Sequence, residues 1–102
     1  MLTNESVLKI FANYLIEDDS LDLLETKHGY ALMLWDTTAQ DWSDIICCRT
    51  PEELFNRLLE FATSYYEYLI LQKQHRDYLN STEKIQIEEI RQKYLKAKIK
   101  LT

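Results

Sequence analysis

The segment that begins at Thr50 restricts the fold of this chain more than any other feature. Thr50-Pro51-Glu52-Glu53 places a hydroxyl at a helix N-cap, a proline at the first helical position and a glutamate at the third. Thr50 can accept a hydrogen bond from a free backbone N–H, Pro51 lacks the N–H that would stay unpaired, and Glu53 can accept from the N-cap amide. The pattern predicts a capping box and the start of a helix.

Apolar residues then recur at three- and four-residue steps over several turns. They are Leu54, Phe55, Leu58, Leu59, Ala62, Tyr65, Tyr66, Leu69 and Ile70. We expect a long helix that ends near Tyr78, because Asn80-Ser81-Thr82-Glu83 supplies a break and a new cap at Asn80 or Ser81.

The last segment has apolar residues at heptad-like spacing. They are Ile87, Ile90, Tyr94, Ala97 and Leu101. This spacing predicts a helix that lies antiparallel to the preceding one as a helical hairpin. An edge strand is the alternative for residues 95–101, since lysines alternate there with apolar residues; we favour the helix.

The first half of the chain predicts one helix followed by strands. Residues 5–16 carry an apolar stripe behind Asn4, which predicts an N-terminal helix, and the acids of residues 17–19 end it because they oppose the helix dipole. Residues 20–29 suit either a two-turn helix that ends at Gly29 or a short strand whose turn uses the positive φ of Gly29. We favour the strand.

Two further segments predict strands. Residues 30–35 are almost entirely apolar, which suits a strand buried on both faces, and residues 44–49 form a second run. The polar residues 36–43 would join them as an antiparallel hairpin with a loop longer than the preferred two residues. The expected fold is therefore α+β: an N-terminal helix, a small antiparallel sheet of two or three strands, and a C-terminal antiparallel helical hairpin packed on one sheet face.

Length and composition limit the class of protein. The 102 residues suffice for a single domain with one core, and the single Gly and single Pro favour helices over a sandwich rich in turns. No run of about 18 apolar residues is present and the first residues lack a secretory pattern, so we expect no membrane association and a cytoplasmic location. Residues 1–50 hold three basic and nine acidic residues, whereas residues 51–102 hold nine and eight.

The residues that could perform catalysis or bind metal form no complete motif. Cys47 and Cys48 are adjacent, so a disulfide between them would be strained, and two thiols are too few for a structural zinc site. His28 and His75 lack partners at the helical spacing of metal sites. The acidic run that begins at Glu17 fails the EF-hand spacing. We therefore predict no cofactor, no metal and no catalytic residue.

An interaction surface is the most specific functional prediction. Asp36, Asp41 and Asp44 surround Trp42, with Trp35 close by in the sequence, and Tyr68 falls off the apolar stripe of its helix. Acidic and aromatic residues together are typical of a surface that binds a basic protein.

These observations favour a noncatalytic protein–protein interaction or regulatory module, either a homodimer through the helical hairpin or a module with another protein partner. An immunity- or antitoxin-like protein that masks a basic partner is one version of it. The alternatives are a small thiol-dependent enzyme, with Cys47 or Cys48 as nucleophile and His28 as base, and a nucleic-acid binder acting through the basic residues after Glu89. The acidic isoelectric point disfavours nucleic acid.

Overall fold

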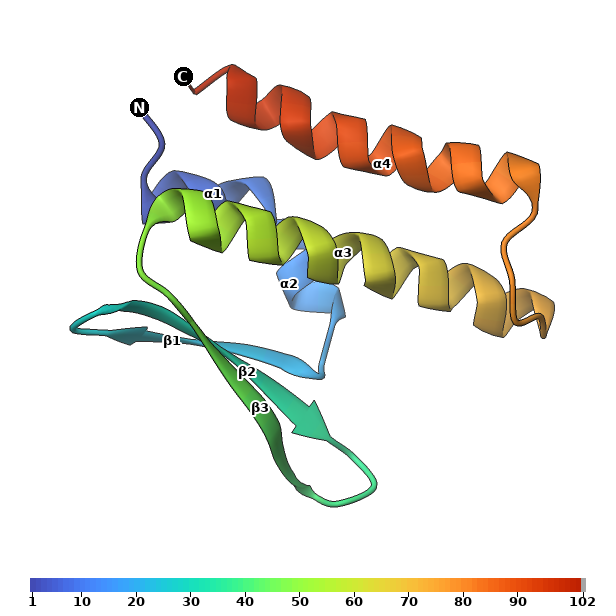
Figure 1. Cartoon of the computed structure of the whole chain (residues 1–102), viewed down its shortest axis with the longest axis horizontal. Helices are drawn as coiled ribbons and strands as arrows, with labels where there is room; N and C mark the ends of the chain where they lie inside the picture. The colour runs from blue at the N-terminus through green and yellow to red at the C-terminus, as the bar shows by residue number, and fades with distance from the viewer. Residues whose placement is uncertain (102) are drawn as a thin grey trace.

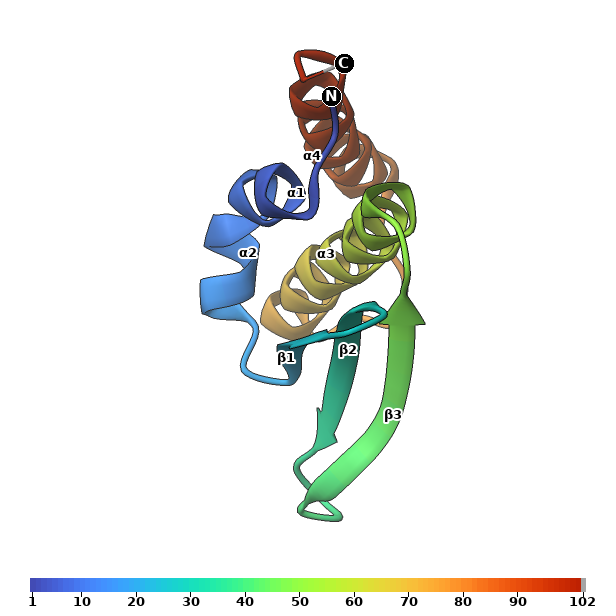
Figure 2. The ribbon, with the colours of Figure 1, turned by 90° about the vertical axis from the view of Figure 1, so that its left-hand side faces the viewer.

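The computed structural model describes residues 1–101, and it confirms the predicted α+β class. Its elements are α1 (Asn4–Ile10), α2 (Ala12–Glu17), β1 (Leu21–Thr26), β2 (Gly29–Asp36), β3 (Asp41–Cys48), α3 (Pro51–Gln74) and α4 (Ser81–Ile99). The strands form one antiparallel sheet in the order β1-β2-β3. All of these helices lie on one side of the sheet, and α3 lies between the sheet and α4 (Figures 1 and 2).

The N-terminal segment is two short helices rather than the single helix predicted for residues 5–16. Thr3, not Asn4, is the N-cap: its Oγ1 accepts from the backbone N–H of Ser6 at 3.1 Å, and Ser6 Oγ accepts from the N–H of Thr3 at 2.9 Å. The break falls at Phe11, whose ring is buried. Its centroid lies 4.5 Å from that of Tyr94, on which it stacks, and 5.3 Å from that of Phe55. The chain changes direction there (Figure 2), so packing of this ring overrides a continuous helix.

The ambiguous residues 20–29 form β1 and its turn, as we favoured. Leu21 pairs with Leu34 and Thr26 pairs with Gly29. Gly29 has a φ of 122°, and a Cβ at this position would lie 2.2 Å from the backbone oxygen of Cys48. Only glycine therefore fits this turn.

The β2–β3 hairpin extends further than the sequence predicts. β3 begins at Asp41 rather than Asp44, and a bulge at Leu34 and Trp35 shifts the register so that Trp35 pairs with Trp42. Asp36 Oδ1 accepts from the backbone N–H of Thr38 at 2.9 Å and stabilises the turn. β2 is buried or half-buried on both faces as far as Trp35, with Ala31 and Leu32 the buried residues, although the helices cover only one face of the sheet.

The start of α3 follows the prediction with one difference. Thr50 Oγ1 accepts from the N–H of Glu53 at 3.1 Å, and Pro51 is the first helical residue. The Glu53 carboxylate accepts from the N–H of Arg49 at 3.0 Å, one residue before the predicted Thr50 amide.

α3 ends at Gln74, before the predicted Tyr78. His75 caps it in the left-handed conformation, with a φ of 53°. α4 starts with a complete capping box between Asn80 and Glu83, and Arg76 forms an ion pair with the Glu83 carboxylate. Residues 95–99 belong to this helix, so the edge-strand alternative is wrong.

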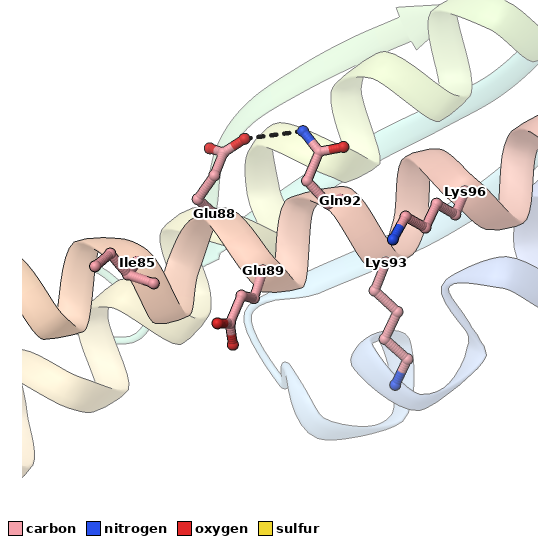
Figure 3. Close-up of a pocket in the computed structure, with 6 residues that line it drawn as sticks. All are labelled: Ile85, Glu88, Glu89, Gln92, Lys93 and Lys96. Atoms are coloured by element: carbon pink, nitrogen blue, oxygen red, sulfur yellow. Dashed lines mark hydrogen bonds between the residues drawn. The ribbon is translucent and has the colours of Figure 1, made fainter.

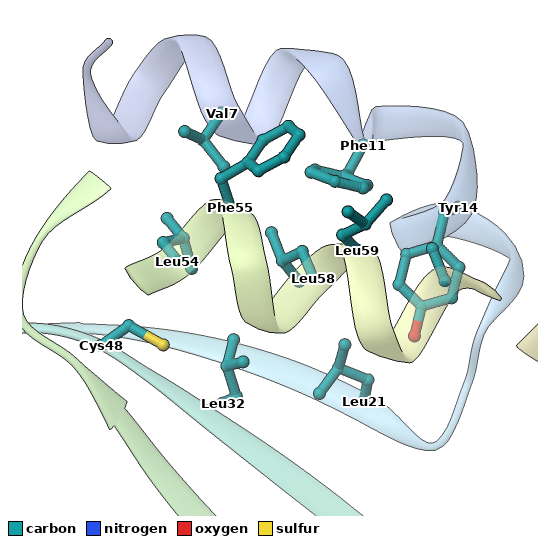
Figure 4. Close-up of a cluster of buried hydrophobic side chains, with 11 residues drawn as sticks. Val7, Phe11, Tyr14, Leu21, Leu32, Cys48, Leu54, Phe55, Leu58 and Leu59 are labelled. Atoms are coloured by element: carbon teal, nitrogen blue, oxygen red, sulfur yellow. The ribbon is translucent and has the colours of Figure 1, made fainter. Parts of the chain in front are cut away.

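The core lies between the sheet and the helices that cover it (Figure 4). α3 and the sheet supply most of it, and α1 and α2 close one side. Its buried members are Val7, Phe11, Tyr14, Leu21, Leu32, Cys48, Leu54, Phe55, Leu58, Leu59 and Ala62. α4 adds the half-buried Tyr94 and Leu95 from the side away from the sheet. Within residues 1–101, no helix is long and apolar enough to cross a membrane.

Candidate functional site

A groove of about 740 Å³ lies between the α2–β1 connection, the end of β2 and one face of α3. We call it the acidic groove. Three carboxylates line it from the connection: Glu17, Asp18 and Asp19. Four aromatic rings also line it: Trp35 from β2, and Phe61, Tyr65 and Tyr68 from α3.

Helical periodicity explains why α3 presents its rings together. Phe61, Tyr65 and Tyr68 are separated by four and three residues, so they lie along one face of the helix. Phe61 and Tyr65 are half-buried, whereas 58% of Tyr68 is exposed. The aromatic wall therefore runs from the core outward to the solvent.

Hydrogen bonds hold the acidic wall in place. Asp18 Oδ2 accepts from the hydroxyl of Tyr14 at 2.7 Å, and its Oδ1 accepts from the hydroxyl of Ser20 at 2.7 Å. The hydroxyl of Tyr65 donates to the backbone oxygen of Glu17 at 3.3 Å, which joins the two walls. Asp18 is thus fixed by internal partners, while the side chains of Glu17 and Asp19 remain exposed.

The groove carries negative charge without compensation. Among residues 1–101, no lysine, arginine or histidine lines it. Burial raises the pKa of Tyr65, and the negative charges of Glu17, Asp18 and Asp19 raise this pKa further. The same field favours any cation that enters the groove.

The structure brings together only part of the predicted interaction surface. Trp35 and Tyr68 meet in the acidic groove although 33 positions separate them in the numbering. Trp42 packs edge-to-face on Trp35, with 5.0 Å between the ring centroids, and is 38% exposed. Trp42 therefore contacts the groove residue Trp35 but does not line the groove itself.

The three predicted aspartates lie outside the groove. Asp36 accepts hydrogen bonds from its turn, and Asp41 and Asp44 are exposed on β3, where each accepts from the next backbone N–H at 2.8 Å. The acids before β1, which the sequence predicts only as the end of a helix and not as part of the interaction surface, line the groove instead. The acidic run was visible in the sequence, but its position opposite α3 was not.

The predicted thiol chemistry has little support in the geometry. Cys48 is 2% exposed, and burial, followed by the charge of Glu53, raises its pKa, which disfavours the reactive thiolate. Cys47 is exposed on the sheet. Within the described chain, no hydrogen bond joins His28 to either thiol; its backbone N–H donates to Thr26 Oγ1. Among residues 1–101, no three His, Cys, Asp or Glu side chains are placed so that they could hold a metal ion together.

The basic end of the chain is distributed over α4. Lys98 pairs with Glu52 of α3 at 2.8 Å and lies over the ring of Phe55 at 5.0 Å. A depression on α4 is lined by residues of this helix, namely Ile85, Glu88, Glu89, Gln92, Lys93 and Lys96, and Gln92 donates a hydrogen bond to Glu88 (Figure 3). Its mixed charge and single wall make it a solvated helix surface.

A second groove, of about 590 Å³, lies between α1 and α4. Four lysines line it together with apolar side chains: Lys9, Lys93, Lys96 and Lys100. Unlike the acidic groove, it is lined by no aromatic ring of residues 1–101.

No protein-family model matches the sequence, and no curated protein or solved structure matches it either. The chemistry of the acidic groove is therefore the feature from which a function can be inferred. Carboxylates that face aromatic rings are complementary to a cationic ligand.

Proposed function

We propose that this protein is a noncatalytic interaction module that binds a basic segment of a partner protein in the acidic groove. The observation that carries the proposal is the arrangement of three carboxylates opposite four aromatic rings, with no basic side chain from residues 1–101 on either wall. An immunity- or antitoxin-like module that masks a basic surface is one form of this function.

Arginine and lysine suit the groove for two reasons. Their charged groups can pair with Glu17 and Asp19 at the rim, and a guanidinium can lie over the face of Trp35 or Tyr68. Their aliphatic stems can cover the apolar surface of Phe61 and Leu69. A basic peptide therefore gains both charge pairing and apolar contact.

The groove lacks the groups that a hydrolytic or thiol enzyme would use. In the part of the chain that the structure describes, neither histidine nor cysteine lines it, and its serines, Ser20 and Ser64, have no neighbouring base there. This composition supports recognition rather than catalysis.

An acetylated and amidated hexa-arginine peptide is a suitable probe for isothermal titration calorimetry. The double variant Glu17→Gln/Asp19→Asn should lower the affinity by about tenfold or more, because two rim charges are lost. Tyr68→Ala should weaken binding by about threefold to tenfold through the loss of a cation–π contact. Added salt should weaken binding of the wild-type protein.

Glu67→Gln is the matched control, since it removes an exposed charge of α3 that does not line the groove. Its affinity for the peptide should stay within about twofold of the wild-type value. Equal losses in the control and in the double variant, or no binding by the wild-type protein, would contradict the proposal. The triple variant Asp36→Asn/Asp41→Asn/Asp44→Asn measures what the β2–β3 turn adds to binding.

A further inference from the structure

The second groove, between α1 and α4, has walls that are fixed against each other at both ends. At one end the ring of Phe11 stacks on that of Tyr94, and at the other the amino group of Met1 donates to the backbone oxygen of Leu101 at 2.6 Å. The two helices are therefore antiparallel, and they lie side by side (Figure 2). We call the groove between them the lysine groove.

The lysine groove has a basic rim and an apolar floor. Three lysines of α4 are separated by three and four residues, so they lie along one face of that helix over about 10 Å. They are Lys93, Lys96 and Lys100, and Lys9 stands on the α1 wall. All four lysines are exposed. The apolar residues between the walls are half-buried, and they are Ile10, Ala97 and Leu101.

The positive charge of this groove is not neutralised by the described part of the chain. No ion pair within residues 1–101 involves any of the four lysines, whereas other basic residues of the helices do pair with acids. Glu5 and Glu89 are the acids nearest to the groove residues in sequence, and neither lines the groove. A protein with a net charge of −5 therefore presents one concentrated basic site.

We propose that the lysine groove binds an amphipathic helix of a partner protein, with glutamate or aspartate on both edges of an apolar stripe. The stripe packs on Ile10, Ala97 and Leu101. Carboxylates on one edge, repeated at three- and four-residue steps, match the spacing of the lysines on α4. Carboxylates on the other edge face Lys9.

The composition and shape of the groove favour this occupant over other anions. A fatty acid has a single carboxylate, which cannot pair with four lysines on two walls. Nucleic acid would leave the apolar floor without a partner, and the part of the groove formed by residues 1–101 has no aromatic ring on which a base could stack. A lipid surface is flat, whereas this apolar surface lies inside a groove. A helix with acidic edges satisfies both the lysines and the floor.

The lysine groove shares no residue with the acidic groove, so this proposal and the proposed function can fail separately. The variant Glu17→Gln/Asp19→Asn should bind an acidic helix within about twofold of the wild-type affinity. Variants of the lysine groove should likewise keep the wild-type affinity for hexa-arginine. If Glu17→Gln/Asp19→Asn abolished binding of the acidic helix, the site would be misassigned.

An acetylated and amidated peptide of three Glu-Leu-Leu-Glu repeats is the probe for isothermal titration calorimetry. Lys9→Gln/Lys96→Gln should lower its affinity by about tenfold or more, because each wall loses a cation. Lys73→Gln/Lys84→Gln is the matched control: it changes the net charge equally, and both of its lysines are exposed outside the groove. It should stay within about twofold of the wild-type affinity. Equal losses in the two variants, or no binding by the wild-type protein, would overturn the proposal.

A second variant tests the floor while all four lysines remain. Ala97→Glu places a carboxylate between the walls and should also weaken binding by about tenfold or more. Glutamate suits a helix, so this variant should fold, and circular dichroism verifies the fold of every variant. Wild-type affinity in Ala97→Glu would show that the peptide does not enter the groove.

Other ligands test the choice of occupant. A peptide of three Glu-Ala-Ala-Glu repeats keeps the charge and the helical propensity but has little apolar surface, so it should bind at least about fivefold more weakly. Equal binding of the two peptides would show that the groove attracts any polyanion. Tighter binding of a twelve-nucleotide oligothymidylate, or of dodecanoate, than of the Glu-Leu-Leu-Glu peptide would overturn the choice of an acidic helix.

Discussion

The two faces of the sheet consist of the same strands and similar apolar residues, yet their surroundings differ. Leu21, Leu32 and Cys48 are nearly fully buried under the helices, whereas Leu24 and Ile45 on the other face are more than half exposed. Successive residues of the edge strands β1 and β3 alternate between these environments, as Ile45 and Ile46 do. Apolar character alone therefore does not establish burial; the position of the helices does.

Truncating one residue on each face should give the largest difference between the two faces in the free energy of unfolding. Leu32→Ala should lower the free energy of unfolding by about 2–5 kcal/mol, because it leaves a cavity under α3. Ile45→Ala should cost less than about 1 kcal/mol in the monomer, because the side chain is already largely in water. Urea unfolding measures both values, and similar losses would show that the sheet face that carries Ile45 is covered as well.

The turn between β1 and β2, which sets the register of these strands, should be the next most sensitive position. Gly29→Ala forces a Cβ toward the backbone oxygen of Cys48 and places alanine at a φ of 122°. We expect a loss of about 2 kcal/mol or more in thermal or urea unfolding. Lys27→Ala in the same turn is the control and should change stability by less than about 0.5 kcal/mol. A neutral Gly29→Ala would mean that this turn does not set the register.

Alkaline pH should lower the stability of the fold through Tyr14, which is buried on the helix side of the sheet. Burial, followed by the hydrogen bond to Asp18, raises the pKa of Tyr14. Since the folded pKa exceeds the unfolded value of about 10, this contribution is complete below pH ~10 and is lost as the pH rises further. Stability should fall by about 1.4 kcal/mol per pH unit there for each tyrosine that stays protonated in the folded state.

The Tyr14→Phe variant is the comparison for this pH dependence. It should have a shallower decline of stability above pH ~10, because phenylalanine does not ionise. At neutral pH it should lose about 1 kcal/mol with the hydrogen bond to Asp18. Tyr78→Phe is the control, since Tyr78 is 84% exposed, and it should leave the decline unchanged. Equal slopes for the wild-type and Tyr14→Phe proteins would contradict the assignment.

The parts of the fold that depend on nearby residues could be predicted. Thr50 and Asn80 cap α3 and α4 because the groups they bind lie three residues further along the chain. The break at Phe11 could not be predicted, since its cause is packing on Phe55 and Tyr94 from distant helices. Such contacts have no local pattern in the sequence.

In the candidate site, too, single residues could be predicted from the sequence, whereas their arrangement could not. Trp35 and Tyr68 could be singled out individually, from an apolar strand and from an exposed position on a helix. Their meeting with Glu17 and Asp19 depends on how α2 and β2 pack against α3. The aspartates near Trp42 were chosen by proximity in sequence, and the hairpin places them outside the groove.

The sequence by itself determined the order of the helices and strands and the starts of α3 and α4, because caps, periodicity and the single glycine act over a few residues. It also determined that acidic residues dominate the first half. Only the tertiary structure decided which side of the sheet the helices cover and which acids face which rings. Those outcomes depend on side chains far apart in the chain, whose shared burial is settled when the elements pack together.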